Sequence, residues 1–366
     1  MVFRRIVGWY EKYERLVSSV SLVGGFVFDA IFLKRVDLFI ENFWIVVHLS
    51  MAAVGIIGLN IVEKRRTQSA EGQQSKSRWH FWLIIWTQFA FGGLLAAFLV
   101  FYFRSTTFLV NWPFIFILAV AFAANEIFKK HYVRLSFQIS LFFLSVYAFA
   151  IFLVPILMHR IGADVFVISG AASLFVLGLF LAGLRFIARE RFVQSRKILW
   201  FSIAGIVLVV NFLYFANLIP PIPISLKDAG IYHSVLKNSA GGYTATEENQ
   251  TWLGIFKQYE DFNDFSNAPV YAYTAIFSPT NFGVSVIHDW QYYDETKKQW
   301  ISVSKIRLPI VGGRDGGYRT YSKKSGIFPG LWRVDVKTIG GQLIGRLKFN
   351  VIESSAQPAL SEVRLE

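Results

Sequence analysis

The chain has 366 residues, a length that suggests two or three domains, and 54% of them are hydrophobic. It contains no cysteine, which excludes disulfides, thiolate catalysis and cysteine-based metal sites. The formal net charge is +13, but the residues from Pro220 onward hold sixteen Lys/Arg against fourteen Asp/Glu, so they carry only +2 of it. The excess lies between apolar runs, which is typical of membrane topology and argues against a nucleic-acid partner.

Long apolar runs dominate residues 1–219. A bilayer core about 30 Å thick requires roughly 20 apolar residues of helix, and the runs that approach this length predict a transmembrane bundle of about seven helices. The first run is short and contains Asp29, so it could instead be re-entrant or interfacial. The runs are Leu16–Leu33, Leu38–Val62, His80–Phe103, Thr107–Phe128, Leu135–Leu157, Val165–Phe186 and Ile198–Leu218.

Basic residues in the loops predict how these helices insert. The N-terminal segment and the loops predicted on the same side of the membrane together hold seventeen Lys/Arg. The loops predicted on the opposite side hold four. Cytoplasmic loops are enriched in Lys and Arg. We therefore expect a cytoplasmic N-terminus in the cytoplasmic (inner) membrane and, after seven crossings, a C-terminal domain that is extracytoplasmic, or periplasmic in a Gram-negative bacterium.

The segment from Ile219 to Pro223 contains three prolines and cannot continue a helix. Beyond it the hydrophobic period changes to two, so residues 220–366 are predicted to form an all-β domain, which we expect to be an immunoglobulin-like sandwich with Trp290 and Trp332 in its core. The predicted strands are Ile231–Val235, Tyr271–Phe277, Val284–Tyr293, Trp300–Leu308, Gly317–Ser322, Leu331–Thr338 and Gln342–Ile352. The polar stretch from Ser239 to Asn267 stays ambiguous between strand and helix.

Several motifs of this domain carry a family resemblance. They read PIPISLKDAGIYHSV, PVYAYTAIFSPT, HDWQYYDETKKQW, LPIVGGRDGGYRTYS, PGLWRVDV and GQLIGRLKF. The region resembles the bacterial domain-of-unknown-function family 2914. That resemblance implies a domain that follows a block of membrane helices, and it implies no activity and no catalytic residues.

Polar residues inside predicted spans are the first functional candidates, because they are costly in a membrane. Asp29 could belong to a functional site or to an interfacial ion cluster with neighbouring charges. His48 could relay protons or bind a ligand, although such a histidine more often hydrogen-bonds a neighbouring helix. Asn60, Gln88, Gln138 and Asn211 are expected to bond neighbouring helices.

In the β domain, the glycine-rich segment Gly312–Ser322 is the most distinctive candidate. Its turn could present N–H groups, with Arg314, Asp315 and Arg319, to an anionic ligand. The competing interpretation is a wide hairpin turn with a local Arg–Asp pair. His233 and His288 stand without a metal-ligand spacing, so neither a metal nor a cofactor is expected.

No nucleophile elbow, zinc-peptidase motif or paired carboxylates appear in the sequence. We therefore favour a non-enzymatic membrane protein that displays a β-sandwich, with the lipid bilayer and an envelope protein or glycan as its partners. The alternative is a transporter or membrane-embedded enzyme with the sandwich as an accessory domain.

Overall fold

The computed structural model describes residues 24–365, except for residues 25, 34, 36, 69–77, 105–107, 128–132, 239–241, 249–258, 266–267 and 281. Contacts within the chain divide it into two compact units, and the chain leaves the helical unit at Ile219 and enters the β unit at Pro220.

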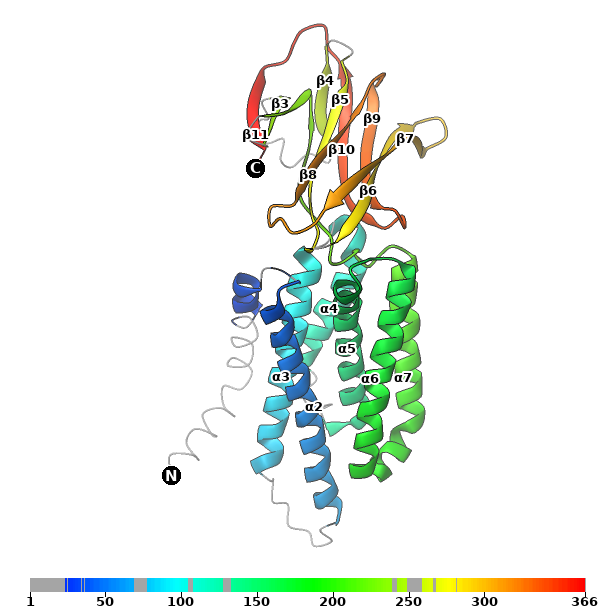
Figure 1. The fold of residues 1–366 in the computed structure, drawn as a ribbon. Helices are drawn as coiled ribbons and strands as arrows, with labels where there is room; N and C mark the ends of the chain where they lie inside the picture. Colours follow the sequence, from blue (N-terminus) through cyan, green and yellow to red (C-terminus); the bar gives the residue numbers. More distant parts are fainter. Residues whose placement is uncertain are drawn as a thin grey trace. The chain divides into compact units, whose positions relative to one another are not determined.

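The helical unit contains the predicted bundle (Figure 1). Its helices are α2 (Phe39–Gln68), α3 (Arg78–Arg104), α4 (Phe108–Ile127), α5 (Leu135–Met158), α6 (Ala163–Ile187) and α7 (Arg189–Phe215). Within the described residues, all of these except α4 are long and apolar enough to cross a membrane. Six predicted runs are therefore helices, and α4 is a shorter apolar one. Most of the first run lies outside the described residues, with residues 26–32 helical.

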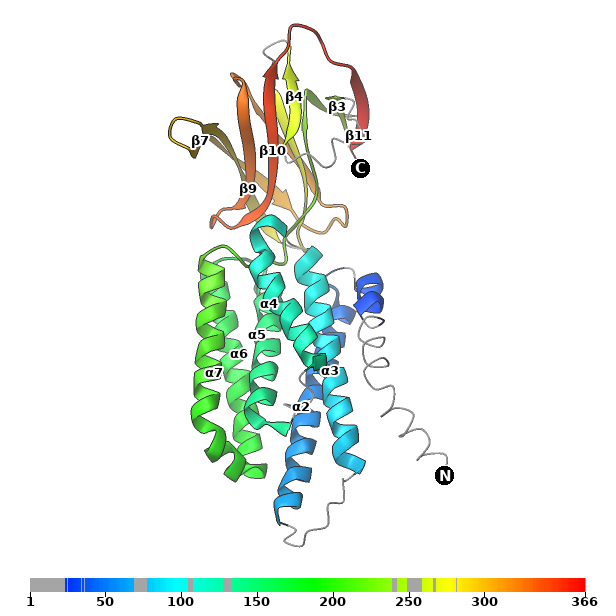
Figure 2. The same ribbon diagram turned by 180° about the vertical axis from the view of Figure 1, so that it is seen from behind.

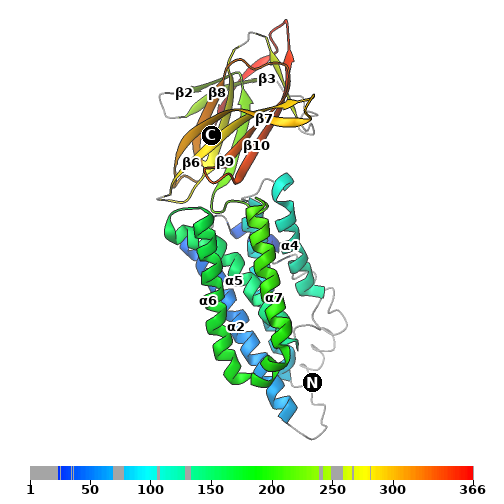
Figure 3. The same ribbon diagram turned by 90° about the vertical axis from the view of Figure 1, so that its right-hand side faces the viewer.

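Polar side chains bond neighbouring helices, as predicted. The Asn60 amide donates to Gln138 Oε1 at 2.9 Å, which joins α2 to α5, and Asn211 donates to the Tyr147 hydroxyl at 3.2 Å, which joins α7 to α5. Gln88 and Asn125 exchange bonds between α3 and α4. The helix α5 is thus joined to α2 and to α7, and Figure 3 shows these helices within one bundle.

The β unit has eleven strands within the described residues, and its sheet order separates three sheets. One sheet has the order β4-β10-β9-β6-β7, a second β1-β5-β8 and a third β11-β3-β2. β4 runs parallel to β10, and the two lie side by side with β9 in Figure 2. The strands are β1 (Ser225–Tyr232), β2 (Ser234–Lys237), β3 (Tyr243–Glu248), β4 (Glu260–Asp264), β5 (Val270–Phe277), β6 (Gly283–Asp294), β7 (Gln299–Val311), β8 (Tyr318–Lys324), β9 (Gly330–Thr338), β10 (Leu343–Glu353) and β11 (Leu360–Leu365).

The five-stranded sheet packs face to face on the sheet β1-β5-β8. Trp290 and Trp332 lie between them at 0% and 1% exposure, together with Ala272 of β5 and Phe349 of β10, so the prediction of a tryptophan core is confirmed. The seven predicted strands all overlap observed strands. β3 and β4 fall in the polar stretch that the sequence left ambiguous, and β11 was not predicted. An immunoglobulin-like topology stays a prediction.

Candidate ligand-binding site of the β domain

In the glycine-rich turn between β7 and β8, two backbone N–H groups donate hydrogen bonds to carbonyls of the chain itself. Gly313 N–H donates to the Ser278 carbonyl at 2.9 Å, and Gly317 N–H donates to the Arg314 carbonyl at 3.1 Å. Gly317 has φ +88°, and a Cβ there would lie 2.8 Å from the backbone nitrogen of Ile276. The close approach of β5 therefore explains this glycine without a ligand.

The three residues proposed for an anion site lie in different environments. Arg314 and Asp315 are exposed in the turn, and the Arg314 guanidinium lies 5.8 Å from the centre of the Tyr318 ring. Arg319 is half-buried on β8, where its Cα pairs with Ala275 of β5. Its Nε is buried and has no hydrogen-bond partner among the described residues. Only Arg319 thus presents an unused buried donor.

A group of tyrosines surrounds this part of β8 and fills the space between the sheets β1-β5-β8 and β11-β3-β2. The rings form a chain of edge or tilted contacts, with centres 5.9 Å apart for Tyr243 and Tyr273, 6.1 Å for Tyr243 and Tyr321, and 5.8 Å for Tyr271 and Tyr321. We call this group the tyrosine layer; its members are Tyr232, Tyr243, Tyr271, Tyr273 and Tyr321.

Tyr273 is the most enclosed member of the tyrosine layer. It is fully buried, and in the part of the chain that the structure describes its hydroxyl has no hydrogen-bond partner. Burial raises the pKa of Tyr273 to about 12; Asp228 adds to the shift and Arg319 opposes it. An unpaired buried polar group costs about 1–3 kcal/mol. Tyr273 of β5 pairs with Tyr321 of β8, and Arg319 lies two residues before Tyr321 on the same strand. Since side chains two residues apart in a strand share a face, both unpaired groups belong to one sheet face.

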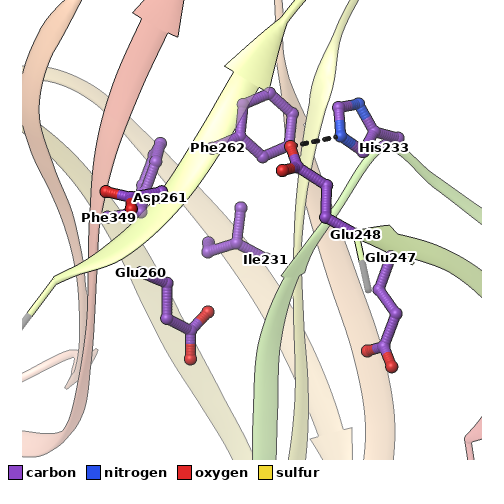
Figure 4. Close-up of a pocket in the computed structure, with 8 residues that line it drawn as sticks. All are labelled: Ile231, His233, Glu247, Glu248, Glu260, Asp261, Phe262 and Phe349. Carbon is purple, nitrogen blue, oxygen red and sulfur yellow. Dashed lines mark hydrogen bonds and ion pairs between the residues drawn. The ribbon is translucent and has the colours of Figure 1, made fainter. Parts of the chain in front are cut away.

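A small acidic pocket lies at β3 and β4 (Figure 4). Its volume of about 20 Å³ is close to that of one water molecule. Glu248 accepts from the backbone N–H and side-chain amide of Asn263, both at 2.6 Å, and lies 3.0 Å from His233 Nε2. The His233 ring stacks on Phe262 at 4.2 Å. Glu248 is therefore already satisfied by the protein.

Metal chemistry receives no support at this pocket. Glu247, Glu260 and Asp261 also line it. In the part of the chain that the structure describes, however, no three His, Asp or Glu side chains are arranged to hold a metal ion.

His48 of α2 is buried and packs between helices. Its Nδ1 lies 3.0 Å from the Trp44 carbonyl on its own helix, and its ring contacts Trp44 and Phe89 with centres 4.6 and 6.0 Å away. A Cβ at Gly93 of α3 would lie 2.5 Å from the ring, so this glycine makes room for the imidazole. The hydrogen bond expected to a neighbouring helix is instead made within α2, and His48 meets α3 by ring packing. A proton-relay role stays a prediction.

Asp29 lies in the helical residues 26–32 and is buried. An ion cluster does form beyond it, where Arg35 holds Asp37 through contacts of 2.9 and 2.6 Å and the Arg35 amide donates to the Glu41 carboxylate. Asp29 takes no part in these contacts around Arg35, and Lys34 lies outside the described residues. A functional role for Asp29 therefore stays a prediction.

Arg191 is one of the seventeen basic residues assigned to loops from the sequence, yet it lies on α7 and its side chain reaches the buried amide network of the bundle. It donates to Asn60 Oδ1 at 2.6 Å and to the Val133 carbonyl. Asn60 and Gln138 are fully buried, so this arginine connects α7 to α2 and α5. The buried amide at Asn60 was the only sequence signal for this contact.

Comparisons with known proteins give few relatives. No curated protein matches the chain. Among solved structures, a β-glucosidase from Listeria innocua, in complex with isofagomine, has a TM-score of 0.20 and 9% identity over 37% of this chain and 17% of its own. An alkylpurine DNA glycosylase from Pseudomonas fluorescens, AlkC, bound to DNA containing an abasic site analog, has a TM-score of 0.23 and 8% identity over 85% of this chain and 98% of its own.

Neither structural similarity reaches a TM-score that carries an argument, and this chain spans only about a sixth of the β-glucosidase's length. The family described as "Protein of unknown function (DUF2914)" has a model that matches residues 284–351, which run from β6 into β10 after the helical region, and this match confirms the resemblance that the sequence motifs carry.

Proposed function

We propose that this chain is an integral protein of the bacterial inner membrane that displays its β domain outside the cytoplasm, where the domain binds an envelope protein or glycan. The observation that supports the binding role is Arg319, which is half-buried beside the tyrosine layer and whose Nε has no hydrogen-bond partner among the described residues.

The orientation follows from the helices and their loops. α2 to α7 alternate in direction along the chain if all of them cross, so the end of α7 lies on the side opposite the basic loop Lys64–Arg78. The β domain is then extracytoplasmic whether or not the first apolar run crosses, because that run determines only the side of the N-terminus. A reporter that is active only in the periplasm, fused after Glu366, tests this orientation; an inactive fusion would refute it.

The binding role rests on the chemistry of the tyrosine layer. Tyrosine and arginine are enriched among residues that dominate binding energy at interfaces. The guanidinium of the half-buried Arg319, with an unpaired N–H, favours a ligand that supplies acceptor oxygens, as a glycan or an acidic side chain does. Such a ligand would recover part of the desolvation cost of this group.

Binding can be tested with the full-length chain purified in detergent and sedimented with peptidoglycan or with outer-membrane fractions. We expect one fraction to retain the protein and Arg319→Ala to weaken retention about tenfold, which is typical for loss of a charge-assisted hydrogen bond. Lys323→Ala removes an exposed charge from the same strand and is the matched control. If no fraction retains the protein, or if the two variants behave alike, the proposed role is wrong.

A further inference from the structure

The outward face of the five-stranded sheet carries a cluster of charges separate from the tyrosine layer. On β6, β9 and β10, residues that alternate with the buried Trp290, Val334 and Leu347 point away from the core. We call the outward charges the charged ladder; its members are Asp289, Arg333, Asp335, Lys337, Arg346 and Lys348. All of them lie within the residues that match the family model.

Two buried aspartates organise the charged ladder. Asp335 is 1% exposed and accepts from Arg346 at 2.5 and 2.9 Å, while Lys337 Nζ lies 3.2 Å away. Asp289 is 3% exposed and accepts from Lys337 at 2.8 Å. Burial disfavours the charge of Asp289, but hydrogen bonds from Lys337, Ser302 and a neighbouring amide outweigh it and lower the pKa of the carboxyl. Both aspartates are therefore committed to cations of the ladder.

The charged ladder contains more cations than these carboxylates neutralise. It has four cations for two aspartates, a surplus of two positive charges. The surplus falls at Arg333 and Lys348, whose Cα atoms are partners on β9 and β10. Arg333 Nε donates to the neutral Gln291 at 2.8 Å and lies 3.8 Å from Asp335. Two like charges thus face each other across neighbouring strands.

Aromatic rings flank this pair of cations. The Arg333 guanidinium lies 4.3 Å from the centre of the Trp300 ring, and Lys348 Nζ lies 5.4 Å from that of Tyr259. Burial lowers the pKa of Lys348, and Arg346 and Arg333 lower it further. Ring contacts and the nearby Asp335 therefore hold two mutually repelling cations in place.

We propose that Arg333, Arg346 and Lys348 form a binding site for a phosphate monoester. A phosphate monoester carries close to two negative charges at neutral pH, which matches the surplus of two, and its three acceptor oxygens can meet three cationic side chains. A carboxylate or a phosphodiester supplies only one charge. Lys305 and Arg307 are exposed on β7, beyond β6 in the same sheet, and add to the attractive field.

A purely structural ladder makes a different prediction. If the two surplus cations only stabilised the sheet, Lys348→Gln would lower the free energy of unfolding. In the proposed site Lys348 repels its neighbours, so the same change keeps or raises resistance to unfolding while it removes anion binding. An anion site therefore predicts that Lys348→Gln loses binding without losing stability, whereas a structural ladder predicts that the variant loses stability.

The test uses the full-length chain in detergent at a pH where the monoester is a dianion. Inorganic phosphate, glycerol 3-phosphate and dimethyl phosphate are titrated by calorimetry. We expect saturable binding of the first two at millimolar concentrations and much weaker binding of dimethyl phosphate, a monoanion. Tighter binding of glycerol 3-phosphate than of inorganic phosphate would identify an esterified ligand as the source, and the reverse order a free phosphate.

Variants locate the binding. Lys348→Gln should weaken phosphate binding about tenfold, Lys348→Arg should retain it, and Lys305→Gln, the matched surface control, should change it about twofold or less. The proposal is overturned if the wild-type chain binds neither glycerol 3-phosphate nor inorganic phosphate, if dimethyl phosphate binds equally well, or if Lys305→Gln and Lys348→Gln lose the same affinity.

Discussion

His288 should make the β domain sensitive to acid. It is fully buried, its Nε2 lies 3.1 Å from Thr274 Oγ1, and its Nδ1 lies 2.9 Å from Ser322 Oγ, which also accepts from the Trp290 indole at 3.0 Å. These contacts connect β6 to β5 and β8 through the interior of the sandwich. Burial disfavours the charged imidazolium and lowers the pKa of His288 from 6.5 to about 4.

The magnitude follows from linkage. Because the folded-state pKa lies below the unfolded value, the unfolded chain binds more protons between pH 6.5 and 4, and stability is lost as the pH falls through that window. A shift of this size corresponds to about 3 kcal/mol in full. Integrated from about pH 7.5 to about pH 5, the loss of unfolding free energy attributable to His288 is about 2 kcal/mol.

The assay is urea unfolding of the full-length chain in detergent, read by pulse proteolysis of the β domain at each pH. His288→Gln keeps a hydrogen-bonding side chain but cannot titrate, so it should remove about 2 kcal/mol of the pH-dependent loss. Thr274→Val is the matched control, because it removes one hydrogen bond and keeps the imidazole; it should lower stability at every pH and retain the slope. If His288→Gln shows the wild-type slope, the assignment to His288 is refuted.

Three further predictions concern stability. Gly317→Ala places a Cβ 2.8 Å from a backbone nitrogen of β5 and should cost about 1–3 kcal/mol in urea unfolding, whereas Gly326→Ala, also at positive φ but with open space, should cost less; equal losses would contradict this. Asp335→Ala leaves half-buried cations unpaired and should cost about 3 kcal/mol, and a loss below about 1 kcal/mol would contradict the buried pairing. Asn60→Leu removes the 2.9 Å bond to Gln138 and should cost about 0.6–1.7 kcal/mol in detergent-driven unfolding of the bundle; an unchanged midpoint would contradict it.

The helical unit was largely predictable because a membrane span depends on local composition. Twenty apolar residues between basic loops identify a helix without knowledge of its neighbours. Helix ends were less accurate: α2 continues to Gln68, six residues beyond the predicted end at Val62, because its last turns are polar. The position of Arg191 in the amide network depends on how α7 packs on α2 and α5, which local composition does not contain.

Strands were predictable where one face is apolar. They were not predictable where a polar segment becomes a strand only by pairing with a partner strand. β9 and β10 alternate cleanly and were placed within two residues. β4 has the sequence EDFND with only Phe262 buried, and it forms because it pairs in parallel with β10, about ninety residues later in the chain. A polar segment with one apolar residue gives no periodicity of its own.

Arg319 was predicted at the candidate site, but Tyr273 was not. The sequence shows tyrosines at alternate positions, Tyr271 and Tyr273, with Tyr321 on a distant strand. This alternation could have indicated a shared outward face. It could not show that the strands bearing Tyr273 and Tyr321 pair in this register, or that a third sheet, with Tyr243, covers them.

Charge illustrates the same separation between local and long-range information. Of the net +13, the +11 before Pro220 is informative through its position in loops, since it predicts insertion. The +2 of the β domain carries no such pattern along the chain. It equals the surplus of the charged ladder, and the twelve other cations and twelve other carboxylate residues of the domain cancel. Arg333, Arg346 and Lys348 become neighbours only through the register of β9 with β10. A weakly charged domain can therefore hold a concentrated anion site, and its total charge is a poor guide to its ligand.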